Sequence, residues 1–235
     1  MKHNINMSVF AGIFLMAFSG VTSAQPYGAR LCANDSRFTC YTVKSGDSWQ
    51  KLFPSSDRRD LVMRLNRMNI HLQRGMRIAV PKNTHDTNML DYSPVRTHIS
   101  PPGKKIIIVS LNENQLAFGA YNADGVLQYW GPVSGGRGYC PDTGHGCHTA
   151  QGTFAIYNRG GAGCRSTKFP VGRGGAPMPY CMYFHGGFAL HGSYEVPGYN
   201  ASHGCVRMFV NDAEWLYNDF TQGDNTTVVI KSSQI

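Results

Sequence analysis

The chain has 235 residues, which is enough for one domain of ordinary size and a smaller one. Its formal net charge of +8 suits an anionic partner such as cell-wall glycan, anionic lipid or nucleic acid. The basic residues are scattered, with DRRD and GKK as small clusters, and the sequence lacks the arginine–aromatic arrangement typical of nucleic-acid recognition. We therefore expect no nucleic-acid partner.

Residues 1–24 have the order of a secretory signal peptide. Lys2 and His3 precede the apolar run SVFAGIFLMAFSG, and small residues follow up to Ala24. The alternative is an uncleaved membrane anchor, although the apolar run is short for a span. No later segment of the sequence is long and apolar enough to cross a bilayer, so we expect an exported protein with no membrane span after cleavage.

The cysteines are expected to pair, because exported proteins meet an oxidising environment. The chain has seven cysteines, which is an odd number. Sequential pairing is the simplest of the fifteen connectivities that six cysteines allow: Cys32–Cys40, Cys140–Cys147 and Cys164–Cys181. This pairing leaves Cys205 as a reactive thiol or as half of an intermolecular bridge.

The first predicted unit after a short leader (residues 25–40, closed by a disulfide loop) covers residues 41–82. YTVKSGDSWQKLF indicates a strand, a glycine turn and a helix capped by Asp47. SSDRRDLVMRLNRMN indicates a second helix capped near Asp57, and RGMRIAVP a closing strand that Pro81 ends. The predicted order is strand, helix, helix, strand.

This unit resembles the LysM module. The matching positions are Tyr41, Val43, Gly46, Asp47 and Ser48 at its start, Asn66 in its centre, and Gly75, Ile78, Val80 and Pro81 at its end. The early Pro54 departs from the family pattern, so we assign no individual glycan contacts. The resemblance implies binding of N-acetylglucosamine-containing glycan strands, here those of peptidoglycan.

Residues 83–103 have the Pro, Asn, Thr and Ser content of a partly extended linker. Residues 104–235 then indicate a mostly β domain. The expected strands are KKIIIVSL, QLAFGAY, VLQYWGPV, GTFAIY, FALHG and TTVVIK. One helix is expected over DAEWLYNDF, with Asn211 and Glu214 as a cap and box. We expect a sandwich or flattened barrel with one or two helices.

The stretch SHGCVR contains the candidate nucleophile. A thiol attacks an acyl carbon as thiolate, so it needs a nearby base and donors for the oxyanion. His191 and His203 both lie within fourteen positions of Cys205. The Gly204–Cys205 step can present consecutive N–H groups, and Arg207 can hold the loop or pair with a carboxylate. The segment CPDTGHGCH could suggest a metal site, but its spacing favours a disulfide-closed loop, and we expect no metal.

The second unit resembles the L,D-transpeptidase (YkuD) catalytic domain, whose signature is a histidine followed after a spacer by (S/T)-H-G-C-(V/I)-(R/N). His191 and residues 202–207 match it, as do MPYCMYF and TAQGTFAIY upstream, the latter with Ala150 and Gln151 in place of the usual proline pattern. The resemblance implies Cys205 as nucleophile and His191 as base, oriented by the carbonyl of Gly192. The other implied positions are His203 as support, the N–H groups of His203, Gly204 and Cys205 as oxyanion hole, Ser202 and Arg207 shaping the loop, and Tyr180 and Met178 in substrate binding.

The resemblance also implies the reaction. The thiol attacks the bond between meso-diaminopimelate and the terminal D-alanine of a peptidoglycan tetrapeptide stem, and a second stem takes the acyl group in a 3→3 cross-link. The acceptor could instead be water, which gives an L,D-carboxypeptidase, or a protein side chain. An inert wall-binding surface protein is the alternative from another class. We expect no cofactor, carbapenem-type β-lactams as inhibitors, and a periplasmic location.

Overall fold

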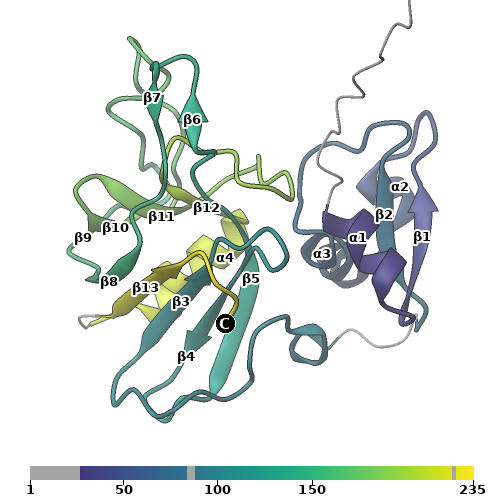
Figure 1. Cartoon of the computed structure of the whole chain (residues 1–235), viewed down its shortest axis with the longest axis horizontal. Helices are drawn as coiled ribbons and strands as arrows, with labels where there is room; N and C mark the ends of the chain where they lie inside the picture. The colour runs from purple at the N-terminus through teal and green to yellow at the C-terminus, as the bar shows by residue number, and fades with distance from the viewer. Residues whose placement is uncertain (1–26, 84–87, 224–225) are drawn as a thin grey trace, which may run out of the picture.

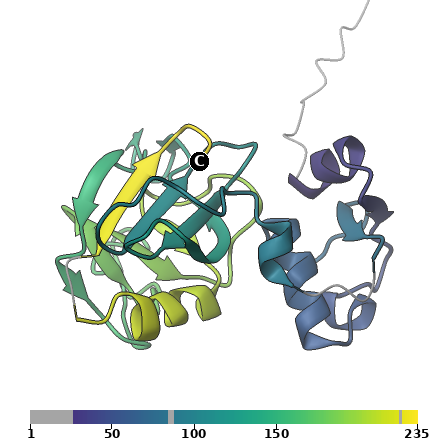
Figure 2. The same cartoon turned by 90° about the horizontal axis from the view of Figure 1, so that it is seen from below.

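The computed structural model describes residues 27–83, 88–223 and 226–235. The predicted signal peptide lies outside them. Figures 1 and 2 show two bodies side by side, a small N-terminal module of helices and two strands and a larger unit built on a curled sheet. Within the described residues, no helix is long and apolar enough to cross a membrane.

The N-terminal module has the predicted order of elements. Antiparallel strands β1 (Phe38–Thr42) and β2 (Arg77–Pro81) enclose helices α2 (Trp49–Leu52) and α3 (Ser56–Leu65). The leader differs from the expectation, because it contains helix α1 (Tyr27–Asn34). The disulfide Cys32–Cys40 ties α1 to β1. The leader is thus part of the folded module.

The two predicted helix caps in this module are wrong by one or two residues. Ser48 caps α2 by accepting from the N–H of Lys51, and Ser55 caps α3 in the same way. Asp47 instead accepts hydrogen bonds from the hydroxyl of Tyr41 and the N–H of Lys44. Asp and Ser are both favourable N-cap residues, so the sequence does not show which of two nearby candidates caps a helix.

The segment between the two units is packed against the larger one. It contains the 3₁₀ turn η1 (Met89–Tyr92), whose Met89 carbonyl accepts from the indole N–H of Trp130 at 2.6 Å. Val95 is buried, and Ile99 donates its N–H to the carbonyl of Gly125. These contacts fix residues that composition alone would leave as a free linker.

The larger unit is one nine-stranded sheet. Its strand order is β8-β13-β3-β4-β5-β12-β11-β10-β9, and the short pair β6–β7 lies apart from it. The bounds are β3 (Ile106–Ser110), β4 (Ala117–Tyr121), β5 (Leu127–Ser134), β6 (Tyr139–Cys140), β7 (His145–Gly146), β8 (Gly152–Ala155), β9 (Asn158–Arg159), β10 (Met182–His185), β11 (Phe188–Gly192), β12 (Val206–Met208) and β13 (Thr227–Lys231).

The sheet curls until its ends approach each other. Phe154 on β8 and Phe184 on β10 lie with ring centroids 5.4 Å apart, although their strands are distant in the strand order. Buried aliphatic residues from both halves share one core under the curl. The mostly β expectation holds, and of the two expected architectures the flattened barrel is the closer one, because the unit is a single curled sheet, a half-barrel.

One helical segment covers the sheet, where the sequence predicted it. Helix α4 (Val210–Trp215) continues as the π-helical turn η2 (Leu216–Phe220). The predicted cap is wrong, because the helix begins before Asn211 and its N-cap residue Phe209 makes no side-chain cap. Ala213 and Leu216 are fully buried in the core of the sheet, so packing fixes this helix.

The two bodies are joined through a buried arginine on α3. The guanidinium of Arg64 forms an ion pair with Asp212, whose side chain is completely buried at the start of α4. It also donates to the hydroxyl of Tyr129 at 2.8 Å and forms an ion pair at 2.7 Å with the partly exposed Asp60. Both charges are removed from water, and this desolvation offsets much of their attraction. The main effect of the ion pair is therefore to fix the contact between the two bodies.

Replacing Arg64 by Ala leaves the Asp212 carboxylate buried without its cation, and we expect a loss of about 3–5 kcal/mol in the free energy of unfolding. The matched variant Asp60→Ala removes a partly exposed partner of the same guanidinium and should cost about 1 kcal/mol or less. Urea denaturation followed by tryptophan fluorescence measures both. Equal and small losses would show that the bodies do not depend on the buried pair.

Candidate active site

The pairing of two parallel strands sets the places of His191, which lies in β11, and of Cys205, which directly precedes β12. In the register of β11 and β12, Leu190 lies opposite Val206 and His191 opposite Arg207. Leu190 and Val206 are fully buried in the core. Side chains alternate along a strand, so Cys205, just before Val206, and His191, just after Leu190, both point to the other face. The nucleophile and base predicted from sequence thus share one face of adjacent strands.

The imidazole of His191 is buried and has a defined tautomer. Its Nδ1 lies 2.9 Å from the carbonyl oxygen of Gly192, and its exposed fraction is 6%. A carbonyl only accepts hydrogen bonds, so Nδ1 carries the proton and Nε2 keeps its lone pair. Burial lowers the pKa of His191 to about 4, aided by the charge of Arg207 and opposed by the Gly192 carbonyl. His191 is therefore a neutral base at physiological pH.

The thiol of Cys205 is neutral at rest as well. Cys205 is half-buried, and its Sγ lies 3.8 Å from the carbonyl oxygen of Gly187. Burial raises the pKa of Cys205, while the backbone N–H of Ala189 and the charge of Arg207 act in the opposite direction. The site therefore holds a protonated thiol and a neutral imidazole, and an N–H group and a positive charge favour the thiolate once the thiol loses its proton.

A tight turn presents Cys205. The hydroxyl of Ser202 donates to the carbonyl of Cys205 at 2.5 Å and accepts the N–H of Gly204 at 3.0 Å. Gly204 has φ +126°, and a Cβ there would lie 2.5 Å from a ring carbon of Phe188. Only glycine suits this position. The bond to Ser202 also engages the Gly204 N–H that was predicted to face the oxyanion.

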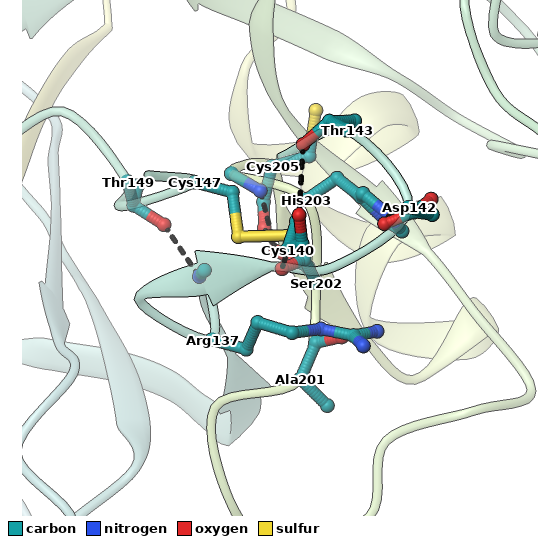
Figure 3. Close-up of a disulfide and its surroundings, with 12 residues drawn as sticks. Arg137, Cys140, Asp142, Thr143, Cys147, Thr149, Ala201, Ser202, His203 and Cys205 are labelled. Atoms are coloured by element: carbon teal, nitrogen blue, oxygen red, sulfur yellow. Dashed lines mark hydrogen bonds and ion pairs between the residues drawn. A yellow bond between two sulfur atoms is a disulfide. The ribbon is translucent and has the colours of Figure 1, made fainter. Parts of the chain in front are cut away.

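A disulfide-closed loop supplies His203 with a partner that sequence reasoning missed. Cys140 and Cys147 are bonded, and Asp142 between them approaches His203 with its carboxylate 2.8 Å from Nε2 (Figure 3). This contact lowers the pKa of Asp142. Phe169 covers the His203 ring with centroids 4.4 Å apart. His203 is thus held between an anion and an aromatic ring.

The cluster around Asp142 has the residue types of a metal site. Ligand atoms of Cys140, Asp142 and His203 lie within 4.8 Å of one another. The sulfur of Cys140 is bonded to Cys147, however, so it is not a thiolate ligand. The cluster fits the predicted disulfide-closed loop better than a metal site. All three disulfides follow the sequential order, and Cys205 is the free cysteine among the described residues.

Met178 and Tyr180, which the sequence predicts to bind substrate, have different surroundings in the structure. Met178 is buried in a small cluster that includes Ala189 and borders Cys205. Tyr180 is half-buried and donates its hydroxyl to the carboxylate of Glu214 at 2.6 Å. The residue between them, Pro179, accepts the N–H of Gly192 at 2.8 Å through its carbonyl. This segment therefore supports the end of β11, and its contact with substrate stays a prediction.

Arg207 lies in β12 opposite His191, and its charge acts on both His191 and Cys205. Its guanidinium donates to the carbonyl of Glu195 at 3.2 Å and lies 3.7 Å from the carboxylate of the same residue. Partial burial lowers the pKa of Arg207, against the attraction of Glu195. Its charge favours the thiolate of Cys205 but disfavours protonated His191, so the two effects oppose each other when the proton passes from the thiol to the imidazole. Arg207 lies in β12 and bonds to Glu195, and its predicted part in shaping the loop stays a prediction.

Comparison with known proteins assigns the larger unit to a family. The family model of the YkuD L,D-transpeptidase catalytic domain matches residues 104–230, which is more than half of the chain. No curated protein sequence matches. A similar solved structure is the L,D-transpeptidase from Xylanimonas cellulosilytica, with 22% identity, 75% of this chain and 80% of that chain covered, and a TM-score of 0.53.

Two further solved structures cover less of either chain. The L,D-transpeptidase from Stackebrandtia nassauensis has 23% identity, with 58% of this chain and 60% of that chain covered, and a TM-score of 0.44. An L,D-transpeptidase from Mycobacterium tuberculosis H37Rv has 22% identity, 54% and 57% coverage, and a TM-score of 0.43. At 22% identity, the similarity to the Xylanimonas cellulosilytica structure supports the fold alone. By the family match over its catalytic unit, the chain belongs to the YkuD family of L,D-transpeptidase catalytic domains.

Proposed function

We propose that the protein is an exported cysteine acyltransferase that acts on the tetrapeptide stems of peptidoglycan and forms 3→3 cross-links. The observation that carries the proposal is the pair of Cys205 and His191 on one face of β11 and β12, within a unit that matches the L,D-transpeptidase family model. The signal-like residues 1–24 support export, and the family supports a periplasmic, cell-wall substrate.

The first half-reaction begins from the neutral pair. Nε2 of His191 takes the proton of the Cys205 thiol as Sγ attacks the carbonyl carbon of diaminopimelate in the L-to-D bond. The Ala189 N–H and the Arg207 charge stabilise the negative charge on sulfur as it develops. The tetrahedral intermediate then expels the amine of D-alanine, which takes its proton from the imidazolium. The products are a thioester on Cys205, free D-alanine and a neutral His191.

The oxyanion of the intermediate needs hydrogen-bond donors near Cys205. The N–H of Gly204 is engaged by Ser202 in the resting turn, so we assign the N–H groups of His203 and Cys205 to this task. The contact between Asp142 and His203 supports the assignment, because it restrains the residue whose N–H is needed. The Ser202 turn then serves to hold these two groups in position.

The second half-reaction decides the product. An amine of a second stem gives a 3→3 cross-link, water gives a shortened stem, and a protein side chain gives a tethered protein. The cross-link is the proposal, because amine attack is the transferase activity for which the family is named. Incubation of the protein with disaccharide-tetrapeptide and separation of the products by mass distinguishes dimers from tripeptides. Tripeptide as the product at every stem concentration would favour the carboxypeptidase instead.

The N-terminal module is proposed to bind the glycan strands. Its LysM-like motif and its strand, helix, helix, strand order support this. The motif residue Asn66 has a structural task, because it bonds to the backbone of Val62 and Ala79. Trp49, which directly follows the start of the motif, is buried and donates its indole N–H to the carbonyl of Ile70. Co-sedimentation with purified peptidoglycan sacculi tests the proposal. A protein that stays in the supernatant would overturn this part.

The nucleophile and the base can be tested with matched variants. Replacing Cys205 by Ala should reduce D-alanine release by on the order of 10⁴-fold, because no thioester can form. His191→Gln should cost a comparable factor, whereas His98→Gln, at an exposed histidine of the same chain, should leave the rate unchanged. Release that persists in Cys205→Ala would refute the cysteine mechanism. A carbapenem should acylate the wild type and leave Cys205→Ala unmodified, as measured by intact mass.

The pH dependence follows from the pKa of His191, which burial lowers to about 4. The base works only when it is neutral, so kcat/KM should hold from about pH 7 to about pH 5 and fall as the pH drops through about 4. If the base had the pKa of an ordinary exposed histidine, kcat/KM would fall with a midpoint at about pH 6.5. Initial rates of D-alanine release in constant-ionic-strength buffers measure the acid limb. A midpoint near the ordinary value would contradict a buried neutral base.

A further inference from the structure

The two halves of the catalytic motif are joined by residues 193–201, which we call the connecting segment. It begins directly after Gly192, whose carbonyl orients His191, and ends directly before Ser202, which holds the Cys205 turn. Its ends are bonded to the catalytic sheet, because the N–H of Ser193 donates to the carbonyl of Met208 and the N–H of Ala201 donates to the hydroxyl of Ser134 at 3.1 Å. The position of this segment therefore bears on both catalytic groups.

The middle of the connecting segment is buried against the N-terminal module. Val196 is fully buried, and Pro197 pairs with Met68 of the module in an isolated antiparallel bridge. Gly198 has φ +86°, and a Cβ there would lie 3.3 Å from the carbonyl oxygen of Asn66. The backbone of the segment thus runs in contact with the chain that leaves helix α3.

One residue of the module makes most of the directed contacts. The side-chain Nδ2 of Asn69 donates to the carbonyl of Ser193 at 2.8 Å, and its Oδ1 accepts the N–H of Val196 at 2.9 Å. The backbone N–H of Asn69 also donates to the carbonyl of Val196 at 3.0 Å. A carboxamide that donates and accepts at once fixes orientation as well as distance.

Asn69 itself is held in place by the catalytic unit. Arg67, two residues earlier, has a positive φ of 56°, which turns the chain out of α3 toward the connecting segment. Its buried guanidinium donates to the carbonyl of Gln115 at 2.8 Å, so the turn is anchored on the larger body. Asn69 is therefore a fixed point against which the segment is positioned.

The contact lies one peptide unit from the catalytic carbonyl. The carbonyl of Gly192 and the N–H of Ser193 belong to one peptide plane, and the carbonyl of Ser193 belongs to the next. The first plane holds Nδ1–H of His191, and the second is held by Asn69. The two planes share the Cα of Ser193 and differ only by rotation about its φ and ψ, so Asn69 restrains the plane next to the one that holds His191.

We propose that Asn69 is a positioning residue of the active site: the N-terminal module holds the connecting segment so that the Gly192 carbonyl keeps His191 in its Nδ1–H form. The module then has a task in acyl transfer besides any affinity for glycan. This inference rests on the proposed function in that His191 is taken as the base. It makes the two bodies one catalytic unit.

The test compares Asn69→Ala with Asn34→Ala, an identical substitution at an exposed residue of α1 whose side chain bonds only within its own helix. The rate of Cys205 acylation by disaccharide-tetrapeptide and by a carbapenem is followed by intact mass. Imidazole ¹⁵N shifts report the tautomer of His191, and the thermal midpoint reports stability. Asn69→Ala should slow acylation by about tenfold, since two side-chain hydrogen bonds are lost. Its His191 should lose the pure Nδ1–H signature, and Asn34→Ala should match the wild type.

A second variant separates positioning from folding. Asn69→Asp keeps the acceptor for Val196 but places a carboxylate against the Ser193 carbonyl, so it should slow acylation at least as much as Asn69→Ala at an unchanged fold by circular dichroism. Wild-type acylation and an unchanged His191 tautomer in both Asn69 variants would overturn the proposal, as would an equal loss in Asn34→Ala. If the wild type fails to acylate, the proposed function fails, while the tautomer comparison still decides the role of Asn69.

Discussion

The parallel pairing of β11 with β12 is the constraint on which the site depends. It sets Leu190 opposite Val206 in the core, and by alternation it puts His191 and Cys205 on the opposite face. A shift of one residue would turn the base or the nucleophile into the core. The burial of Leu190 and Val206 therefore stabilises the fold and the catalytic register at the same time.

The same burial determines the chemistry. Removing His191 from water favours its neutral form, and the bond from Nδ1 to Gly192 leaves Nε2 as the free lone pair. Burial likewise keeps the Cys205 thiol protonated, with an N–H group and the Arg207 charge ready for the thiolate. In the proposed reaction the proton leaves the thiol as it attacks the substrate. Until then the protonated thiol resists oxidation, because the thiolate is the reactive form.

Sequence predicted the features that are local in the chain. The signature around Cys205, the three short-range disulfides and most strands of the sheet were accessible from motifs, spacing and alternation. The contacts of Asp142, Arg64 and Asn69 were not, because each joins residues far apart in sequence. Asp142 and Asn69 lie in loops and Arg64 on a helix, but no periodic pattern names the partner of any of them, so only the folded topology reveals their contacts. The incorrect caps have a local cause, since neighbouring Ser and Asp compete for the same N–H groups.

The central claim is that Cys205 is a free thiol that accepts an acyl group from a tetrapeptide stem. The most direct measurement is intact mass of the non-reduced protein, first with a thiol label and then with disaccharide-tetrapeptide, followed by peptide mapping. We expect one thiol label, on Cys205. With disaccharide-tetrapeptide we expect a thioester on the same residue and one D-alanine released per adduct. No label would mean that Cys205 is bridged. A thiol that takes the label but is never acylated by the tetrapeptide stem would contradict the acyltransferase function and favour a wall-binding protein.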